Sequence, residues 1–214
     1  MKTVKILICI VGLLLNISSD AKNKHDGELL SKKDEIAEKL ESQISSSEAL
    51  FEKNNGQFEA DFQYRFSSNS ACVDFYQDKI LFSLRKVKRD FNPQKVDEPM
   101  LFEYVSWHIE LSNTNLVTIE SVGHTIRSNV NYFSKNGKNI KKVSSSSIKY
   151  EGIYPNIDLV FYKSENDELK YDFVLHPGAR LSDIALTYNG VENIEIDDLG
   201  NLVYSTPWGS IKEE

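Results

Sequence analysis

Cysteine, proline and basic charge are all scarce in this 214-residue chain, and each scarcity excludes a class of protein. The 5 Pro and 10 Gly are too few for a collagen-like repeat or a low-complexity linker. Two cysteines, Cys9 and Cys72, cannot build a disulfide-rich secreted scaffold. The 25 Lys and Arg are outnumbered by 32 Asp and Glu, which gives a net charge of -7. Because nucleic-acid binding depends on neutralising phosphates, we expect no nucleic-acid partner.

The one long apolar run lies at the N-terminus. Lys2 and Lys5 precede an unbroken apolar stretch over residues 6–15, and Ser19-Asp20-Ala21 offers small residues for a cut after Ala21. This is the pattern of a signal peptide. The stretch is about half the ~20 apolar residues that a spanning helix needs. We therefore predict that residues 1–21 are a cleaved signal peptide, with an uncleaved anchor as the alternative.

Two segments follow the predicted signal peptide. Residues 22–50 are polar, with apolar residues at roughly helical spacing, and this predicts a short amphipathic helix or a loosely ordered leader. From residue 51 the helical spacing is replaced by short β-type runs. We therefore divide the chain into a signal peptide at 1–21, a polar helical leader at 22–50 and a β-rich extracytoplasmic domain at 51–214. Only Cys72 remains after cleavage, and we expect it to be a small buried residue rather than a reactive thiol.

The β-type runs are short and separated by Asn, Gly, Asp and Ser, which favours antiparallel strands. In the run 102–111, Val105, Trp107, Ile109 and Leu111 alternate with more polar residues, as expected when one face of a sheet is buried. The serines at 144–147 are expected to form a loop. The fold class is predicted as mainly β, an antiparallel sandwich-like domain, and two packed sheets are one arrangement that this pattern allows. The predicted strands are 62–66, 71–76, 80–87, 102–111, 116–122, 148–153, 157–162, 169–176, 184–188, 194–196, 202–205 and 208–212.

Several motifs of this domain occur together in one known family. They are Asn54-Asn55-Gly56-Gln57-Phe58, Val130-Asn131-Tyr132-Phe133, the run from Tyr150 to Ala179, and Leu199-Gly200-Asn201-Leu202. Through them the chain resembles the N-terminal domain of unknown function of bacterial secreted and surface proteins, often found ahead of SBBP-type β-propeller repeats. The resemblance implies an all-β extracytoplasmic module and brings no catalytic residues. Members of that family usually run on into repeats, so ending at Glu214 implies either a fragment or a reduced version.

Asp158 and Asp172 are the most distinctive polar residues of the Tyr150–Ala179 run. If Tyr162 pairs with Leu169, both carboxylates lie among large apolar residues. A buried carboxylate needs hydrogen-bond donors or a charge partner. Two interpretations stay open at this point. One is an acid/base pair with raised pKa values, and the other is a pair of structural carboxylates that accept backbone N–H groups at chain corners.

Aromatic residues near turns are candidates for binding a sugar. Trp208 lies in a Thr-Pro-Trp-Gly turn, and Tyr154 precedes Pro155. Stacking on a sugar requires rings that are exposed on a rigid surface. The loop 197–201 has acidic and glycine residues but lacks the ligand spacing of a calcium loop, so we expect a hairpin turn there.

No metal, cofactor or nucleophile motif stands out, and we expect neither a metal site nor a cofactor. The sequence predicts a non-catalytic extracytoplasmic module of a bacterial secreted or surface protein, with a structural, adhesion or interaction role. Its partner would be a surface protein or a glycan, and the mature chain would have no stable membrane span. One alternative is a glycan-binding module that uses Trp208 and Tyr154. A second is a secreted hydrolase that uses Asp158 or Asp172.

Overall fold

The computed structural model describes residues 4–9, 50–68, 71–87, 102–133, 137, 139–164 and 168–213. Within them the chain is almost entirely antiparallel β-strand, with one short 3-10 turn at Leu181–Asp183, so the prediction of a mainly β chain is confirmed. The predicted helical leader lies outside the described residues except for Leu50. No helix in the described part of the chain is long and apolar enough to cross a membrane.

Eleven strands form one sheet in the order β1-β10-β9-β8-β2-β3-β4-β5-β6-β11, and β7 pairs with β8 off this path. Strands β12, β13 and β14 form a second, small sheet. The strands are β1 Val4–Cys9, β2 Phe51–Lys53, β3 Tyr64–Ser67, β4 Ala71–Phe75, β5 Lys79–Val87, β6 Phe102–Leu111, β7 Ile119–Phe133, β8 Asn139–Tyr154, β9 Ile157–Lys163, β10 Leu169–Leu175, β11 Leu186–Asn189, β12 Glu192–Ile196, β13 Leu202–Thr206 and β14 Gly209–Glu213.

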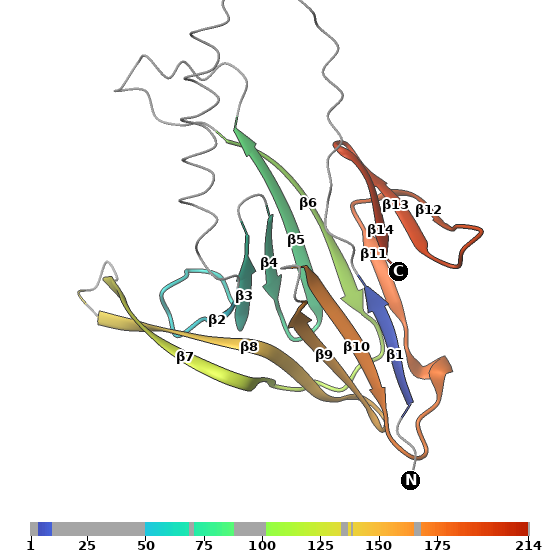
Figure 1. Ribbon diagram of the computed structural model, residues 1–214, viewed down its shortest axis with the longest axis horizontal. Coiled ribbons are helices and arrows are strands. Elements are labelled where there is room, and N and C mark those ends of the chain that lie inside the picture. Colours follow the sequence, from blue (N-terminus) through green and yellow to red (C-terminus); the bar gives the residue numbers. More distant parts are fainter. Residues whose placement is uncertain are drawn as a thin grey trace, which may run out of the picture.

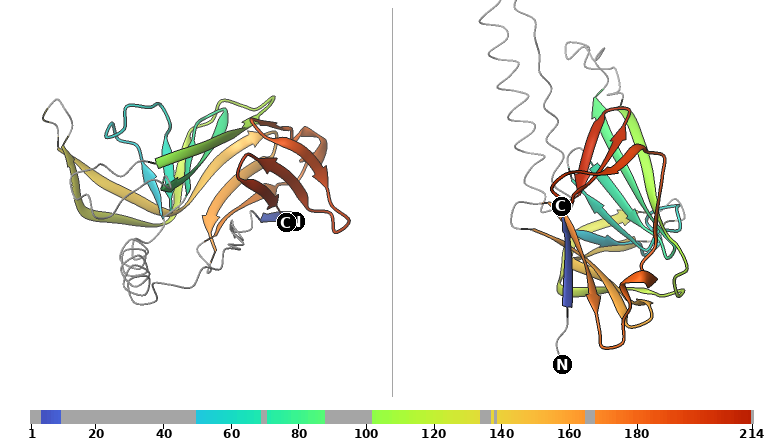
Figure 2. Two further views of the ribbon diagram at one scale, coloured as in Figure 1. Left: turned by 90° about the horizontal axis from the view of Figure 1, so that it is seen from above. Right: turned by 90° about the vertical axis from the view of Figure 1, so that its right-hand side faces the viewer.

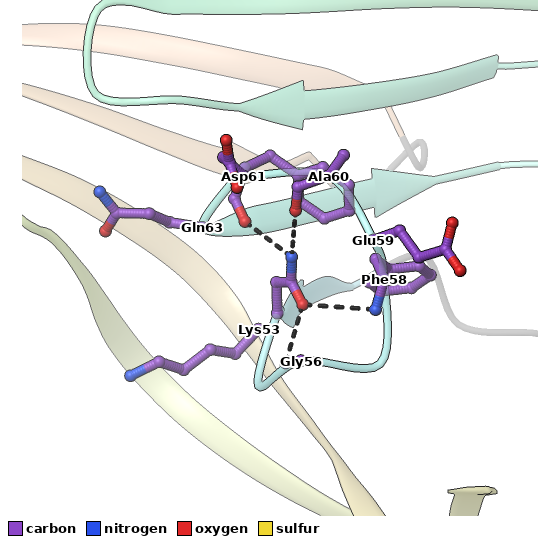
Figure 3. Close-up of a pocket in the computed structure, with 9 residues that line it drawn as sticks. Lys53, Gly56, Phe58, Glu59, Ala60, Asp61 and Gln63 are labelled. Atoms are coloured by element: carbon purple, nitrogen blue, oxygen red, sulfur yellow. Dashed lines mark hydrogen bonds between the residues drawn. The ribbon is translucent and has the colours of Figure 1, made fainter. Parts of the chain in front are cut away.

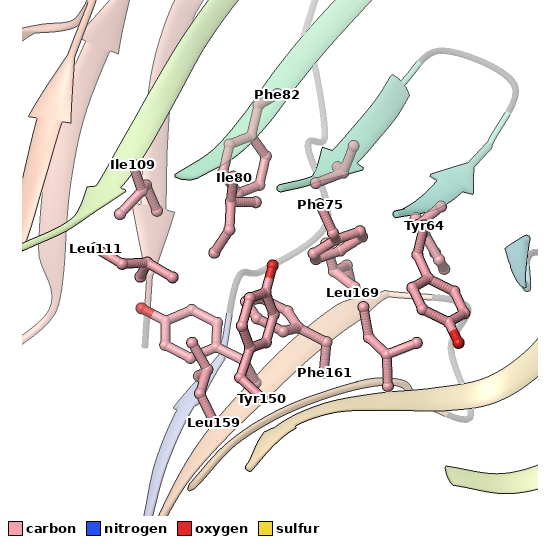
Figure 4. Close-up of a cluster of buried hydrophobic side chains, with 14 of the residues drawn as sticks. Tyr64, Phe75, Ile80, Phe82, Ile109, Leu111, Tyr150, Leu159, Phe161 and Leu169 are labelled. Atoms are coloured by element: carbon pink, nitrogen blue, oxygen red, sulfur yellow. The ribbon is translucent and has the colours of Figure 1, made fainter. Parts of the chain in front are cut away.

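The large sheet bends into two wings, formed by strands β3 to β6 and strands β7 to β10. The two wings face each other across the core (Figures 1 and 4). Phe75 of β4 and Ile80 of β5 point toward Tyr150 of β8 and Phe161 of β9. The rings of Phe75 and Phe161 pack edge to face, with centroids 4.9 Å apart. The facing layers are thus parts of one continuous sheet, and the second sheet of the structure is the small one formed by β12, β13 and β14.

The small sheet closes one end of the molecule, opposite the long β7–β8 hairpin (Figure 2). Tyr204 of β13 and Ile211 of β14 are buried. The Tyr204 ring packs against the rings of Trp107 of β6 and Tyr188 of β11, with centroid distances of 6.2 and 5.3 Å. The small sheet therefore packs against β6 and β11 and completes the core at this end.

Alternating burial in β6 follows the sequence pattern closely. Trp107, Ile109 and Leu111 are buried, while His108 and Glu110 lie on the other face. The Trp107 ring stacks on Phe82 of β5 with centroids 5.2 Å apart. The prediction that Trp107 belongs to the core is confirmed.

The serine run at 144–147 is not a loop, which corrects the sequence prediction. These residues lie in the middle of β8, and Ser144 and Ser145 are buried. They pair with Glu52 and Phe51 of β2, so they form the junction between the two wings of the sheet. Small side chains leave little apolar signal in a sequence, which explains why periodicity missed a strand here.

β7 is also longer than predicted, because it runs to Phe133 rather than ending at Val122. A bulge interrupts its pairing with β8 between Val122 and Thr125. Gly123 occupies the bulge with a φ of 80°, a conformation that side chains other than glycine rarely adopt. The bulge lets β7 continue along β8 with a changed register.

Candidate functional site

The β9–β10 hairpin places Asp158 and Asp172 on the outer face of the sheet. Asp158 pairs with Val174, and Asp172 pairs with Val160. The expected pairing of Tyr162 with Leu169 is wrong by one residue, because Leu169 pairs with Lys163. The observed register keeps the apolar residues of both strands on the core face, and a one-residue slip would have opposed core-facing and outward positions.

Asp158 is held by partners from three directions. Its Oδ1 accepts a hydrogen bond from the Gly152 backbone N–H at 2.7 Å, and its Oδ2 lies 2.9 Å from Nε2 of His176. Burial raises the pKa of the Asp158 carboxyl, but the bonds from His176 and Gly152 and the charge of Lys149 lower it by more, so the net shift is downward. Asp158 therefore resembles a structural anion more than a general acid.

Asp172 borders a depression of about 420 Å³ on the outer face of β8, β9 and β10. Ser147, Val160, Tyr162 and Val174 complete its lining. The Tyr162 hydroxyl donates to Oδ1 of Asp172 at 3.2 Å. Asp158 and Asp172 share a face of the sheet and occupy diagonal positions of the β9–β10 pair. Asp158 does not line this depression, so the two carboxylates do not converge on it.

A second depression, of about 390 Å³, lies within the loop that joins β2 to β3 (Figure 3). Asn54 organises this loop from inside. Its Nδ2 donates to the carbonyls of Ala60 at 2.8 Å and Phe62 at 3.0 Å. Its Oδ1 accepts from the backbone N–H groups of Gly56 at 3.0 Å and Phe58 at 3.5 Å. We name residues 54–63 the Asn54 loop.

The Asn54 loop is closed at its ends and supported from beneath. The Asn54 N–H donates to the Gln63 carbonyl at 2.9 Å, which joins the two ends. The Arg65 guanidinium lies 4.5 Å from the Phe58 ring centre and 4.4 Å from that of Phe62. Nε and Nη2 of Arg65 also donate to the two carboxylate oxygens of Asp74, at 2.6 and 2.8 Å. The loop is thus a preorganised element on the protein surface.

Cys72 lies next to this support. It is half-buried in β4, and its Sγ is 3.7 Å from Asp74. Burial and the charge of Asp74 raise the pKa of the Cys72 thiol. A raised pKa keeps the thiol protonated near neutral pH. The sequence predicted a buried Cys72, whereas the residue is half-buried.

A buried carboxylate in β14, Glu213, is an unusual polar group in the described core, and it was not predicted from the sequence. Glu213 is 2% exposed. Three tyrosine hydroxyls donate to it: Tyr171 at 3.0 Å and Tyr188 at 2.9 Å to Oε2, and Tyr204 at 2.9 Å to Oε1. Burial raises the pKa of Glu213, and the three tyrosines offset part of that rise. One signal in the sequence was its spacing from Ile211. Residues two positions apart in a strand share a face, so Glu213 lies on the same buried face as Ile211.

The aromatic residues that were candidates for sugar stacking are found in two different settings. Tyr154 is fully buried, and its hydroxyl donates to the Ala185 carbonyl at 2.8 Å. Trp208 is half-buried at the turn between β13 and β14. The Nζ atom of Lys86 lies 4.3 Å from the centre of the Trp208 ring, so a cation already occupies one ring face.

The acidic loop 197–201 is the hairpin turn between β12 and β13, as the sequence predicted. Oδ1 of Asp197 accepts from the backbone N–H groups of Leu199 at 3.0 Å and Asn201 at 2.9 Å. These bonds, together with that from the Asn201 side chain, lower the pKa of Asp197 to about 2. Its oxygens stabilise the turn internally. Among the described residues, no group of three or more His, Cys, Asp or Glu could hold a metal ion.

Comparison with known proteins identifies a family and no specific function. The family described as a domain of unknown function, DUF7948, matches residues 51–214. No curated protein matches the chain. No solved structure matches it either.

Proposed function

Because the chain belongs to the DUF7948 family of domains of unknown function, we propose its role from its own geometry: a non-catalytic extracytoplasmic module that binds a surface partner through the Asn54 loop. The observation that carries this proposal is the set of four hydrogen bonds of the Asn54 side chain, two donated and two accepted, which fix an exposed loop around a depression of about 390 Å³. Binding residues are often located on loops that a rigid scaffold positions.

The chemistry of the depression suits recognition of a polar partner. Its rim includes the exposed side chains of Lys53 and Asp61, and Phe58 adds a half-exposed ring. The Gln63 side chain accepts from the Ile119 N–H at 3.1 Å, which ties the loop to β7. A loop that is ordered before binding loses less conformational entropy when a partner docks.

The internal bonding of the carboxylates supports a non-catalytic role. Asp158 accepts from a backbone N–H and contacts His176, while Asp172 accepts from Tyr162. Glu213 is enclosed by three tyrosines away from the surface. Each of these three carboxylates is thus hydrogen-bonded by groups of the protein itself.

Glycan binding is the second candidate, and one observation favours it. The depression is lined by the half-exposed ring of Phe58 and the exposed carboxylates of Glu59 and Asp61, an aromatic and polar lining of the kind that binds small ligands, although Arg65 covers one face of the Phe58 ring. The same depression would therefore serve, with Trp208 as a separate contact. A hydrolase that uses Asp158 and Asp172 has less support, because only Asp172 borders a depression.

Export is tested by separating the cell fractions of a strain that produces the full chain. We expect the protein outside the cytoplasm, shortened by roughly the 15–30 residues of a signal peptide. N-terminal sequencing of the exported form locates the cut. Full-length protein that stays in the cytoplasm would contradict the proposed location.

Binding is tested with microspheres coated with the full chain, applied to immobilised cell-envelope material and to xylan, chitin and alginate. We expect retention on one of these surfaces, reduced at least tenfold by Asn54→Ala and by the pair Lys53→Glu and Asp61→Lys. Glu120→Lys on the exposed face of β7 is the matched control and should leave retention unchanged. Retention on envelope alone supports a protein partner, and retention on one polysaccharide supports the glycan alternative. Equal retention of all variants would exclude the Asn54 loop as the binding site.

A further inference from the structure

One edge of the large sheet is completed by a segment of the predicted signal peptide. β1 pairs antiparallel with β10 over six residues, from Val4 opposite Leu175 to Cys9 opposite Lys170. β1 is the outermost strand on this side, and Figure 1 shows it alongside β10 at the border of the sheet. The backbone groups of β10 that face β1 therefore obtain their partners from a segment that export would remove.

The exposed edge of β10 would be long and adjacent to the core. β10 has seven residues, and its side chains at Leu169, Tyr171 and Phe173 are buried. Its apolar side packs closely, since Tyr171 and Phe173 contact each other with ring centres 6.0 Å apart. A straight edge of this length presents a row of unpaired N–H and C=O groups that favours addition of a further strand.

We propose that β10 is a strand-acceptor site: once the leader is removed, an extended apolar strand of another protein adds antiparallel to β10 where Val4–Cys9 lies. This inference rests on the export proposed above. The register defines the ligand, because Ile6 and Ile8 lie opposite Phe173 and Tyr171. The occupant is thus a segment of about six residues with aliphatic side chains at alternate positions.

A second copy of this chain is a poorer occupant. When two β10 strands pair antiparallel over all seven residues, Asp172 lies opposite Asp172 of the copy. Like charges directly opposite each other destabilise a strand pair. In contrast, β1 places an uncharged residue, Leu7, opposite Asp172.

The test uses the full chain in two forms: with β1 paired to the edge of β10, and with this pairing disrupted by substitutions in β1. In the double variant Ile6→Pro and Leu7→Pro, one of the two missing N–H groups belongs to the row that faces β10, because amides alternate in direction along a strand. The variant Ile6→Ala and Leu7→Ala keeps the amides and is the matched control. The probe is a fluorescein-labelled peptide of residues 2–10 with Cys9→Ser, followed by fluorescence anisotropy.

We expect the peptide to bind the proline variant at least tenfold more tightly than the wild type or the alanine control. N-methylation of one alternate set of peptide amides should abolish binding, and methylation of the other set should not. Asn54→Ala should leave peptide binding unchanged, which separates this site from the Asn54 loop. Equal binding to all forms, or dimerisation of the proline variant in place of peptide binding, would overturn the proposal.

Hydrogen exchange of the wild-type chain keeps the proposal testable if the proline variant fails to fold. Amides of β10 should exchange as slowly as those of β9, because β1 covers the edge. Rapid exchange of alternate β10 amides in the wild type would show that the leader does not occupy the edge, and would overturn the proposal.

Discussion

Asp158 and His176 bind each other at the open end of the β9–β10 hairpin, with Nε2 of His176 2.9 Å from Oδ2 of Asp158. The second oxygen of Asp158 accepts from the N–H of Gly152, which lies near the end of β8. One carboxylate thus ties together the corners of three strands. His176 remains partly accessible, with 44% of its side chain exposed.

Asp158→Asn should lower the free energy of unfolding at pH 7 by about 1.5–3 kcal/mol, the usual contribution of hydrogen bonds to a charged group. The pKa of Asp158 is lowered in the folded state, so its stabilisation is present above the unfolded pKa of about 3.9 and is lost as the pH falls further. Urea unfolding at pH 7, 5 and 3 measures this. If the difference in unfolding free energy between wild type and variant stayed constant down to pH 3, the ionised Asp158 carboxylate would not be the source of the stabilisation.

Glu213 should give the opposite pH dependence. Its pKa is raised by burial, so the folded state holds the proton more strongly than the unfolded state. Stability should therefore fall as the pH rises from about 4.3, the unfolded pKa, through the folded value. Glu213→Gln should flatten this slope, which thermal unfolding between pH 4 and pH 8 would measure. An unchanged slope would show that Glu213 does not titrate in this range.

Glu213→Ala should be far more damaging than Glu213→Gln. It leaves the hydroxyls of Tyr171, Tyr188 and Tyr204 without their shared acceptor in the core. At about 1–3 kcal/mol for each unsatisfied buried group, we expect a loss of roughly 3 kcal/mol or more. Urea unfolding of the two variants side by side makes the comparison. Equal losses would mean that side-chain volume matters more than hydrogen bonding.

Asn54→Ala should loosen its loop while leaving the core intact. The variant removes two donor and two acceptor contacts, all within residues 54–62. We expect faster hydrogen exchange and faster proteolysis confined to this loop, with a loss of only about 1–2 kcal/mol in unfolding free energy. Asn54→Asp keeps the acceptor oxygen that Gly56 and Phe58 use, so its effect should be intermediate. Faster exchange throughout the sheet would contradict a local role.

Two glycines offer a matched test of the β7 bulge. A Cβ on Gly123 would clash with Oγ of Ser146, whereas a Cβ on Gly152 would meet nothing within 4 Å. Both residues have positive φ, so both alanine variants carry a backbone cost of about 1–2 kcal/mol. Gly123→Ala should cost more, because Ser146 must also move. Equal midpoints in urea unfolding would mean that the bulge rearranges freely.

The sequence predicted those strands whose two faces differ in polarity. The strand 102–111 was predicted with its observed bounds, because Trp107, Ile109 and Leu111 alternate with polar residues. Strands without such contrast were missed or shortened. β2 has only three residues, and the distal half of β7 carries apolar and polar residues without strict alternation.

The candidate site was harder to predict, because it depends on contacts between distant segments. Asp158 and Asp172 were located in the correct hairpin, but the one-residue error in register gave them the wrong neighbours. The Asn54-Asn55-Gly56-Gln57-Phe58 motif was noted for its resemblance, yet nothing in it reveals that Asn54 fills its own loop. The Glu213 cluster joins β10, β11, β13 and β14, which no local pattern connects.

The three residues of β2 have a consequence for the order of folding. Strands β3 to β6 and strands β7 to β10 each form a series of sequential neighbours, so each wing can assemble from contacts that are close along the chain. β2 pairs with β3 on one side and with residues about ninety positions away in β8 on the other. Closing so large a loop costs entropy before any contact is gained. The two wings should therefore form early, with the β2–β8 pairing made late, so that substitutions at Phe51 accelerate unfolding more than they slow folding.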